Sequence, residues 1–404
     1  MKPLRQLPQQ KDIRRAKRAI EELALSNSSL SPICCEFDQW EDPLSWVSKS
    51  HDKTRFFWSD RETNIGIGGI GISDVIGKKE TLRRVRKRSE MGQRRYFGGF
   101  FFGGEFGQLW APLWWTDGKK LVYNPPFPTH DALINPLPFT SESKPNQKEW
   151  MSMMEKAIDQ LHSGSIDKIV LARQQKISVI LDAFDCLKTL MTDQTRAYSF
   201  AFQPGGDSIF IGRSPERLFY MNQDTLKTEA IAGTRSIDIV DGDNELLNSD
   251  KDRREHALVV DGIVASLKSL GLSANAERSP TVIKSGNLIH LKTHIECDVS
   301  ENIRPEQILD VLHPTAAVCG SPTREAYRLI AELEPFDRGW FAGPIGWCDH
   351  RAAEFAVAIR SATFKDDKAI VYAGAGIVKG SDPLLEWSEI AAKGSQYLKF
   401  RTDK

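Results

Sequence analysis

Three segments in the last quarter of the chain limit both its fold and its chemistry. They are H-P-T-A-A-V-C-G-S-P (313–322), A-I-R-S-A (358–362) and the stretch from Y-A-G-A-G-I-V to E-W-S-E-I-A-A-K (372–393). The third segment predicts a strand that runs into a tight glycine turn and is followed by a loop and a helix. The helix start is well defined, because Ser381 or Asp382 suits the N-cap and Pro383 suits the first turn.

One face of this predicted helix is charged. Glu386, Glu389 and Lys393 lie three and four residues apart, which places them on the same side of a helix. Paired carboxylates supply the hard oxygen ligands that divalent cations prefer. Gly374 and Gly376 carry no side chain, so backbone N–H groups at the predicted turn can approach an anion. The segment therefore predicts a divalent-cation site beside a small anionic substrate.

Composition argues against several classes of protein. Among the 404 residues, Lys+Arg and Asp+Glu both number 54, so bulk charge favours neither nucleic acid nor a membrane as partner. Six cysteines without C-x-x-C spacing predict buried free thiols in a reducing compartment. The polar N-terminus and the absence of a long apolar run lead us to expect a cytoplasmic protein with no membrane partner.

The order of the predicted elements indicates an α+β fold. The segment 124–148, rich in Pro, Ser, Thr and Asn, is the best boundary candidate, dividing a β-rich part (1–145) from residues 146–404. Helices are predicted at 11–25, 147–162, 246–270 and 323–333, and strands at 31–37, 54–58, 65–72, 96–102, 109–115, 120–124, 168–179, 341–347, 354–364 and 369–378. This order predicts helices packed outside antiparallel sheets.

Together these segments resemble the chorismate-binding enzymes: isochorismate synthases, salicylate synthases, and the large subunits of anthranilate and aminodeoxychorismate synthases. The resemblance covers residues 146–400 through further ordered blocks. These are D-K-I-V-L-A-R (167–173), G-R-S-P-E-R-L (212–218), E-A-I-A-G-T-R (229–235), D-R-R-E-H-A-L-V (252–259) and L-I-H-L-K-T (288–293). It implies a sheet-on-sheet core flanked by helices, similar to the anthranilate synthase large subunit, with the active site in a cleft.

Two glutamates are expected to hold a metal ion. Glu255 fits either a solvated helix face or the inward side, one turn before an apolar stripe that begins at Leu258. An inward-facing carboxylate requires a cation. The resemblance implies that Glu255 and Glu389 bind Mg²⁺, with Glu386 contributing directly or through water.

The acid and the base of the reaction are also candidates. Lys168 begins an alternating strand, where it is either solvent-facing or partly buried, and burial would favour its neutral form. Glu216 follows Ser-Pro and by itself indicates a surface turn. The resemblance implies that Lys168 activates water and that Glu216 protonates a departing hydroxyl group, which requires a carboxyl group of raised pKa.

Cations and backbone donors are expected to bind the substrate carboxylates. Arg360 is predicted in the middle of an apolar strand, where a bidentate carboxylate clamp is its natural role. His290 fits a core histidine and a substrate contact equally well. The resemblance assigns further substrate contacts to Gly233, Thr234, His290, Ala317, Gly374 and Lys393.

Three positions favour the isochorismate synthase branch, an isomerase of hydroxymutase type. Lys168 stands where ammonia-using anthranilate synthases typically carry Gln. Ala232 stands where aminodeoxychorismate synthases typically carry Lys, and Ala317 where anthranilate and salicylate enzymes typically carry Thr. The resemblance then implies Mg²⁺-dependent, reversible water addition at C2 of chorismate with loss of the C4 hydroxyl. Salicylate synthase and anthranilate synthase component remain the alternatives.

The resemblance leaves the biological setting open. Isochorismate feeds menaquinone or phylloquinone, siderophore or salicylate synthesis, and the N-terminal part is somewhat more similar to the quinone-pathway enzymes. We expect no glutaminase subunit, and a monomer or a homodimer.

Two motifs point to other classes. G-I-G-G-I-G (66–71) matches a dinucleotide-binding pattern, but its alternating isoleucines predict a strand with no helix after it. The basic run 83–88, followed by R-R-Y-F-G-G-F-F-F (94–102), is similar to an RNA-binding surface, so nucleic-acid binding is the alternative function of another class. The balanced charge of the chain instead predicts a solvated helix followed by a buried strand.

Overall fold

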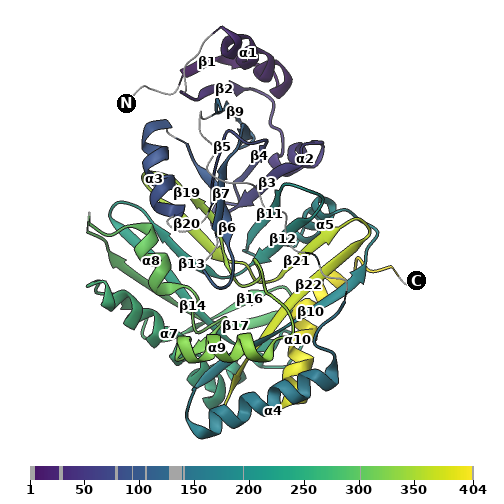
Figure 1. Cartoon of the computed structure of the whole chain (residues 1–404), viewed down its shortest axis with the longest axis vertical. Coiled ribbons are helices and arrows are strands. Elements are labelled where there is room, and N and C mark those ends of the chain that lie inside the picture. The colour runs from purple at the N-terminus through teal and green to yellow at the C-terminus, as the bar shows by residue number, and fades with distance from the viewer. Residues whose placement is uncertain are drawn as a thin grey trace.

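Two large β-sheets form the body of the protein in this computed structural model (Figure 1). The structure describes residues 5–26, 31–77, 81–92, 94–104, 107–126, 139, 142–193, 195–300 and 302–402. Within these ranges the first sheet has twelve strands, in the spatial order β1 (Arg5–Gln10), β2 (Ile33–Phe37), β9 (Lys120–Tyr123), β8 (Trp114–Thr116), β4 (Gly66–Ile70), β3 (Thr54–Ser59), β11 (Tyr198–Pro204), β12 (Ile209–Ser214), β21 (Ser361–Lys365), β22 (Lys368–Val378), β10 (Lys168–Ser178) and β18 (Gly320–Ser321).

The second sheet is antiparallel throughout its described strands. Its order is β15 (Asn275–Ala276), β17 (Leu288–Asp298), β14 (Thr225–Ser236), β13 (Arg217–Met221), β20 (Ala353–Val357), β19 (Pro344–Cys348), β6 (Tyr96–Phe100), β7 (Gly107–Ala111) and β5 (Asp74–Gly77), with β16 (Thr281–Ser285) also paired to β17. In the first sheet, β1 and β2 form a parallel pair.

Aromatic side chains from both sheets meet in the core. Phe56 of β3 stacks on Phe97 of β6 with ring centroids 4.1 Å apart, and Trp110 of β7 meets Phe202 of β11 edge-on at 5.6 Å. Each of these pairs joins one sheet to the other, and burying such rings contributes strongly to the stability of a core. This arrangement confirms the predicted α+β class with one sheet packed on the other.

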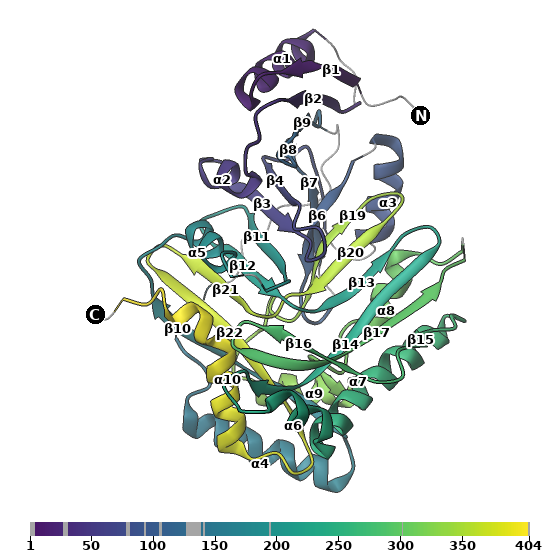
Figure 2. The same cartoon turned by 180° about the vertical axis from the view of Figure 1, so that it is seen from behind.

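Helices cover the outer faces of the sheets, as Figures 1 and 2 show. They are α1 (Ile13–Leu25), α2 (Pro43–Ser48), α3 (Thr81–Gly92), α4 (Gln147–Ser163), α5 (Ala183–Leu190), α6 (Gly242–Asn248), α7 (Asp250–Ser269), α8 (Pro305–Leu312), α9 (Thr323–Leu333) and α10 (Pro383–Leu398). Among the described residues, no helix has the length and apolar character needed to cross a membrane.

Local capping explains where the helices near the candidate site begin. The Asp382 side chain accepts hydrogen bonds from the N–H groups of Leu384 and Leu385 at 2.9 Å, which starts α10 as predicted. The predicted helix 246–270 is instead divided into α6 and α7. Ser249 adopts an extended backbone there, and its hydroxyl accepts from Asp252 N–H at 3.3 Å to cap α7.

Strands from before and after residue 145 occupy separate halves of each sheet, and the two halves meet at one strand pairing. In the first sheet β3 pairs with β11, and in the second β6 pairs with β19. The predicted strand 109–115 is in fact two strands, β7 and β8, which belong to different sheets. The division at 145/146 stays a prediction, and part of the boundary segment, 127–138 with 140–141, lies outside the described residues.

The two motifs that are similar to dinucleotide-binding and RNA-binding sequences have structural roles in this fold. Residues 66–70 form β4 between β3 and β8, as predicted for a strand. The basic run lies on α3, and Arg88 pairs with Asp74 at 2.5 Å. Tyr96 and Phe97 of β6 are buried in the core. This strand therefore lacks the exposed rings that stack on bases.

Candidate active site

A cavity lies where strands from both sheets meet α7 and α10. It is lined by apolar side chains together with a few convergent charged and polar groups, which is typical of small-molecule sites. Nine of the eleven predicted site residues line it: Glu216, Gly233, Thr234, Glu255, His290, Ala317, Arg360, Gly374 and Lys393. The other two lie directly behind the wall, because Lys168 contacts Glu255 and Glu389 contacts Lys393.

Arg360 is placed differently from the prediction. It is not in the middle of a strand but between β20 and β21, with φ of 53°, where the chain crosses from the second sheet to the first. Its guanidinium is buried, and burial lowers the pKa of Arg360 to about 10, so the group stays cationic at neutral pH. Nη1 donates to the Lys393 carbonyl at 3.2 Å, and among the described residues no carboxylate pairs with it. A buried cation without a counterion suits an anionic ligand.

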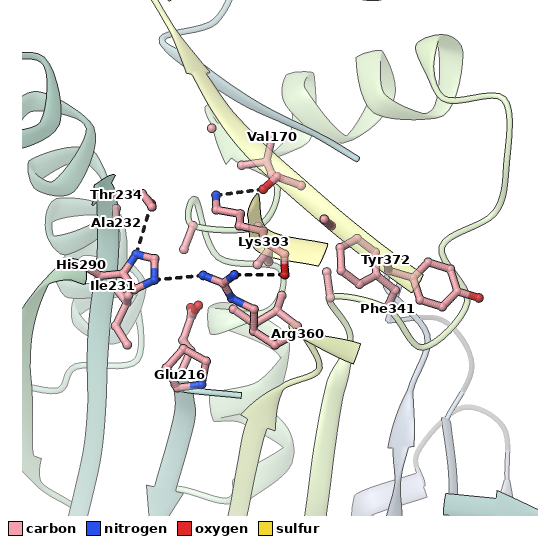
Figure 3. Close-up of a pocket in the computed structure, with 18 of the residues that line it drawn as sticks. Val170, Glu216, Ile231, Ala232, Thr234, His290, Phe341, Arg360, Tyr372 and Lys393 are labelled. Carbon is pink, nitrogen blue, oxygen red and sulfur yellow. Dashed lines mark hydrogen bonds between the residues drawn. The ribbon is translucent and has the colours of Figure 1, made fainter. Parts of the chain in front are cut away.

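His290 fixes the orientation of that guanidinium (Figure 3). Arg360 Nη2 lies 3.0 Å from His290 Nε2, and because a guanidinium only donates, Nε2 must accept. The proton is then on Nδ1, which lies 3.2 Å from the Gly233 carbonyl and 3.1 Å from the Thr234 hydroxyl. Burial and the Arg360 charge lower the pKa of His290 well below 6.5, which agrees with a neutral ring. His290 thus lies in the cavity wall rather than in the general core.

The backbone conformation at position 233 requires a glycine. It occupies an irregularity in the pairing of β14 with β17 and has φ of 76°, a region that favours glycine. The bulge aims its carbonyl group at His290 and brings Thr234 to the cavity wall.

Glu216 is a buried carboxyl group rather than a surface turn residue. It lies between β12 and β13, where its N–H donates to the Ser214 hydroxyl at 3.2 Å and its carbonyl accepts from Val357 N–H at 3.1 Å. Burial, followed by the negative charge of Glu229, raises the pKa of Glu216 to about 8. At neutral pH the side chain is therefore protonated, and it points into the cavity beside Arg360 and His290 (Figure 3).

Lys168 and Glu255 form a buried ion pair. Lys168 is 0% exposed, and its Nζ lies 3.0 Å from Glu255 Oε1. Burial raises the pKa of Glu255, but the charge and hydrogen bond of Lys168 outweigh this and lower it. Apart from this contact with Glu255, Lys168 Nζ has no hydrogen-bond partner in the part of the chain that the structure describes. Because an ammonium group has three N–H donors, Lys168 retains donors that can bind a water molecule.

The two glycines of the last segment do not form a turn. Gly374 and Gly376 lie inside β22, opposite Ala172 and Val170 of β10. A Cβ atom on Gly376 would lie 2.2 Å from Glu255 Oε1, so the glycine makes room for that carboxylate. Gly374 presents its carbonyl oxygen to Lys393 Nζ at 2.9 Å. The glycines therefore permit close packing around the charged groups, which corrects the predicted turn of N–H donors.

The candidate metal ligands come from two helices. Glu255 is on α7, while Glu386 and Glu389 are on α10. Glu386 pairs with Lys251 at 2.9 Å and Glu389 with Lys393 at 2.6 Å. Among the described residues, no three acidic, histidine or cysteine side chains converge on one point.

The chemistry of these carboxylates nevertheless suits a divalent cation. Burial and the charge of Glu389 raise the pKa of Glu386, so two negative groups on α10 repel one another. The donors are all hard oxygens, and the Lys251 side chain is 37% exposed and can turn away into solvent. Magnesium therefore fits the donor set.

Sequence reasoning missed two buried pairs near the cavity. Arg338 lines it and donates to the carbonyl groups of Val170 and Val318, while its partner Glu334 accepts from Ala172 N–H at 2.8 Å. This pair connects β10 to the segment that carries Ala317. Its four-residue spacing is also typical of an exposed helix pair, so only the surrounding apolar residues could have indicated burial.

The second missed pair is Arg61 with Glu229. Glu229 is a fully buried carboxylate in β14, and both of its oxygens accept from Arg61. A glutamate within the apolar stretch E-A-I-A was a signal that could have been used, but its partner lies 168 residues away.

Comparisons with known proteins agree with this site. The family model described as chorismate binding enzyme matches residues 112–400. The isochorismate synthase MenF of Haemophilus influenzae is 36% identical over 274 residues, covering 65% of this chain and 63% of that protein. The isochorismate synthase MenF of Bacillus subtilis is 30% identical, covering 87% of this chain and 89% of that protein.

The fold is similar to that of a solved relative over almost its whole length. The menaquinone-specific isochorismate synthase MenF of Escherichia coli superposes with a TM-score of 0.81 and 27% identity, covering 94% of this chain and 98% of that one. The predicted resemblance and fold class are thus confirmed. The chain belongs to the chorismate-binding enzyme family.

Proposed function

We propose that the protein is an isochorismate synthase that converts chorismate into isochorismate by water addition at C2 and loss of the C4 hydroxyl. The observation that carries this proposal is one cavity that combines a buried, protonated Glu216 with Arg360, a buried cation that pairs with no carboxylate among the described residues. Lys168 lies directly behind Glu255 in the same wall, and beyond this pair it has no other hydrogen-bond partner among the described residues. The site thus contains an acid, a base and an anion receptor.

Substrate binding depends on the cations of the cavity. Chorismate carries two carboxylates, and Arg360 is the natural partner of the enolpyruvyl carboxylate. His290 and the Lys393 carbonyl hold the guanidinium in place before substrate arrives, which lowers the entropic cost of binding. Thr234, Gly233, Ala317 and Gly374 complete the wall.

The chemical step is a paired acid–base reaction. In its neutral amine form, Lys168 removes a proton from water as the water oxygen bonds to C2, and becomes an ammonium group paired with Glu255. The ring double bonds shift, and Glu216 gives its proton to the C4 hydroxyl, which leaves as water. The acid and the base exchange roles in the reverse direction, so the reaction is reversible.

Glu255 and Glu389, with Glu386 beside them, would hold a magnesium ion. The ion would supply a Lewis acid for the ring carboxylate of the substrate. In the structure, the Lys393 side chain pairs with the carboxylate of Glu389, and the Lys393 carbonyl group accepts a hydrogen bond from Arg360.

Water rather than ammonia is the proposed nucleophile, because the base is Lys168. Ala232 and Ala317 both line the cavity, where their short side chains distinguish it from the other branches of the family. No glutaminase subunit is then needed. The similarity to a menaquinone-specific relative supports a role in quinone synthesis. A cytoplasmic monomer or homodimer is part of the same proposal.

A product assay tests this proposal. Purified protein is incubated with chorismate and Mg²⁺, and the products are separated by liquid chromatography. Isochorismate without pyruvate is the expected result. Salicylate with stoichiometric pyruvate, or anthranilate with pyruvate when ammonium is present, would assign another branch, and unchanged chorismate would refute the proposal.

A further inference from the structure

Glu229 is a buried carboxylate near Glu216, the proposed general acid, and it makes four polar contacts. Both of its oxygens accept from Arg61, Oε2 lies 3.0 Å from Lys292 Nζ, and Oε1 accepts from the backbone N–H of Arg217 at 2.7 Å. Burial raises the pKa of Glu229, but the charges and hydrogen bonds of Arg61 and Lys292 outweigh this and hold it at about 2. The side chain is therefore ionised throughout the working pH range.

These contacts reach the backbone on both sides of Glu216. Glu229 binds the N–H of the residue after it, and Arg61 Nη1 donates to the carbonyl group of Pro215 before it. The backbone of Glu216 itself is bonded to Ser214 and Val357. The segment that carries the acid is thus fixed at every peptide group, although it lies between two strands.

We propose that Glu229, acting with Arg61, is a positioning residue for Glu216, because the pair fixes the backbone on both sides of the acid and directs its carboxyl group into the cavity. The proposal rests on the acid role given to Glu216 under the proposed function. Glu229 contacts neither the substrate cavity nor the reacting atoms, so it acts only through Glu216.

The same contacts influence the pKa of Glu216. The charged or titratable groups around the Glu216 carboxyl group are Glu229 on β14, Lys168 on β10, Arg61 after β3, Lys393 on α10, Arg217 on β13, and in the same cavity wall Glu255, His290 and Arg360. After burial, the charge of Glu229 is the main influence that raises the pKa of Glu216, whereas Lys168, Arg61 and Lys393 lower it. Glu229→Gln would remove the raising charge and leave Arg61 and Lys292 without a counterion. Both effects favour the ionised form of Glu216.

The experiment compares Glu229→Gln with Glu354→Gln as a matched control. Glu354 is also buried and accepts a hydrogen bond from the Arg217 side chain at 3.1 Å, but among the described residues it makes no hydrogen bond to the backbone beside Glu216. We expect the alkaline limb of the kcat–pH profile to move down by about one pH unit in Glu229→Gln, which lowers kcat at pH 8 about fivefold. The KM for chorismate should change little, and Glu354→Gln should keep the wild-type limb.

A second readout does not depend on turnover. The protonated carboxyl band of Glu216, identified in the infrared by its absence from Glu216→Gln, should titrate at lower pH in Glu229→Gln than in wild type. If Glu229→Gln does not fold, Glu229→Asp takes its place. This variant keeps the negative charge but moves it away from the Arg217 N–H, so the Glu216 band should shift in the same direction by a smaller amount. An unshifted band and limb in the folded variant would overturn the proposal.

The two readouts also separate this proposal from the proposed function. A wild-type protein that leaves chorismate unchanged would refute the function, yet the infrared titration would still test the link between Glu229 and Glu216. An active wild type with an unaltered Glu229→Gln profile would refute the positioning role alone.

Discussion

Replacing Glu216 by glutamine removes a carboxyl group that the fold holds in its protonated form. The pKa of Glu216 is about 8 in the folded protein, against an ordinary value of 4.5. Between these two pH values the folded chain binds more protons than the unfolded chain, so the free energy of unfolding falls as pH rises. Below pH 4.5 the group is protonated in both states and has no such effect. Glutamine is similar in size and does not titrate, so the variant should lose this pH-dependent destabilisation.

The size of the effect follows from the two pKa values. Each pH unit between them is worth about 1.4 kcal/mol, so the carboxyl group costs about 1 kcal/mol at pH 5 and about 4 kcal/mol at pH 8. With an unfolding entropy of about 2 cal/mol/K per residue, the 404-residue chain changes its Tm by about 1 °C per 0.8 kcal/mol. The Tm advantage of Glu216→Gln over wild type should therefore grow by about 4 °C between pH 5 and pH 8.

Calorimetric melting of both proteins at the two pH values measures this difference. Turnover should change in the opposite direction, because loss of a general acid costs about 10²–10⁴-fold in kcat. A Tm difference that is equal at pH 5 and pH 8 would show that the Glu216 carboxyl group is not protonated at neutral pH. Near-normal kcat in the variant would separately refute its role as the acid.

Three further predictions concern the other charged groups of the cavity. In Gly376→Ala the new Cβ would lie 2.2 Å from the Glu255 carboxylate, so this carboxylate should be displaced and Mg²⁺ activation should weaken about 10–100-fold. Gly394→Ala is the control, because its Cβ would make an ordinary contact at 3.5 Å, and it should keep activity. A kcat for Gly376→Ala equal to that of the wild type at all Mg²⁺ concentrations would contradict this prediction. Glu255→Gln and Glu389→Gln should each abolish activity and Mg²⁺ binding by calorimetry without changing the near-ultraviolet circular dichroism, and EDTA should inactivate the wild type reversibly. Full activity in metal-free protein would refute this assignment. Arg360→Ala should raise the Kd and KM for chorismate about 10–100-fold with a smaller change in kcat, and unchanged binding in a titration would remove its role as carboxylate receptor.

Features set by neighbouring residues could be predicted from the sequence. Asp382 and Pro383 define the start of α10 because capping depends on atoms within one turn. The alternating pattern from Lys168 likewise predicts β10. The ordered blocks of the chorismate-binding family then indicated which side chains would meet in the cavity.

The errors have a common physical cause, which is dependence on the tertiary structure. The segment around Arg360 looks like one strand because β20 and β21 are both apolar, and the sheet crossing between them uses a non-glycine residue of positive φ that leaves no turn signal. Gly374 and Gly376 suggested a turn, yet the atoms that require a small residue at 376 belong to α7. The Glu229–Arg61 pair joins residues 168 positions apart, which no local pattern reveals.

Isotope labelling distinguishes attack by a water molecule from transfer of the hydroxyl group within the substrate. If Lys168 activates water for attack at C2 and Glu216 releases the C4 hydroxyl as water, isochorismate formed in H₂¹⁸O should carry one ¹⁸O atom, in its C2 hydroxyl, after a single turnover. We expect this label in the wild-type product, and no labelled product from Lys168→Ala. Unlabelled isochorismate from the wild-type protein would rule out water addition at C2, because the hydroxyl group would then have moved within the substrate.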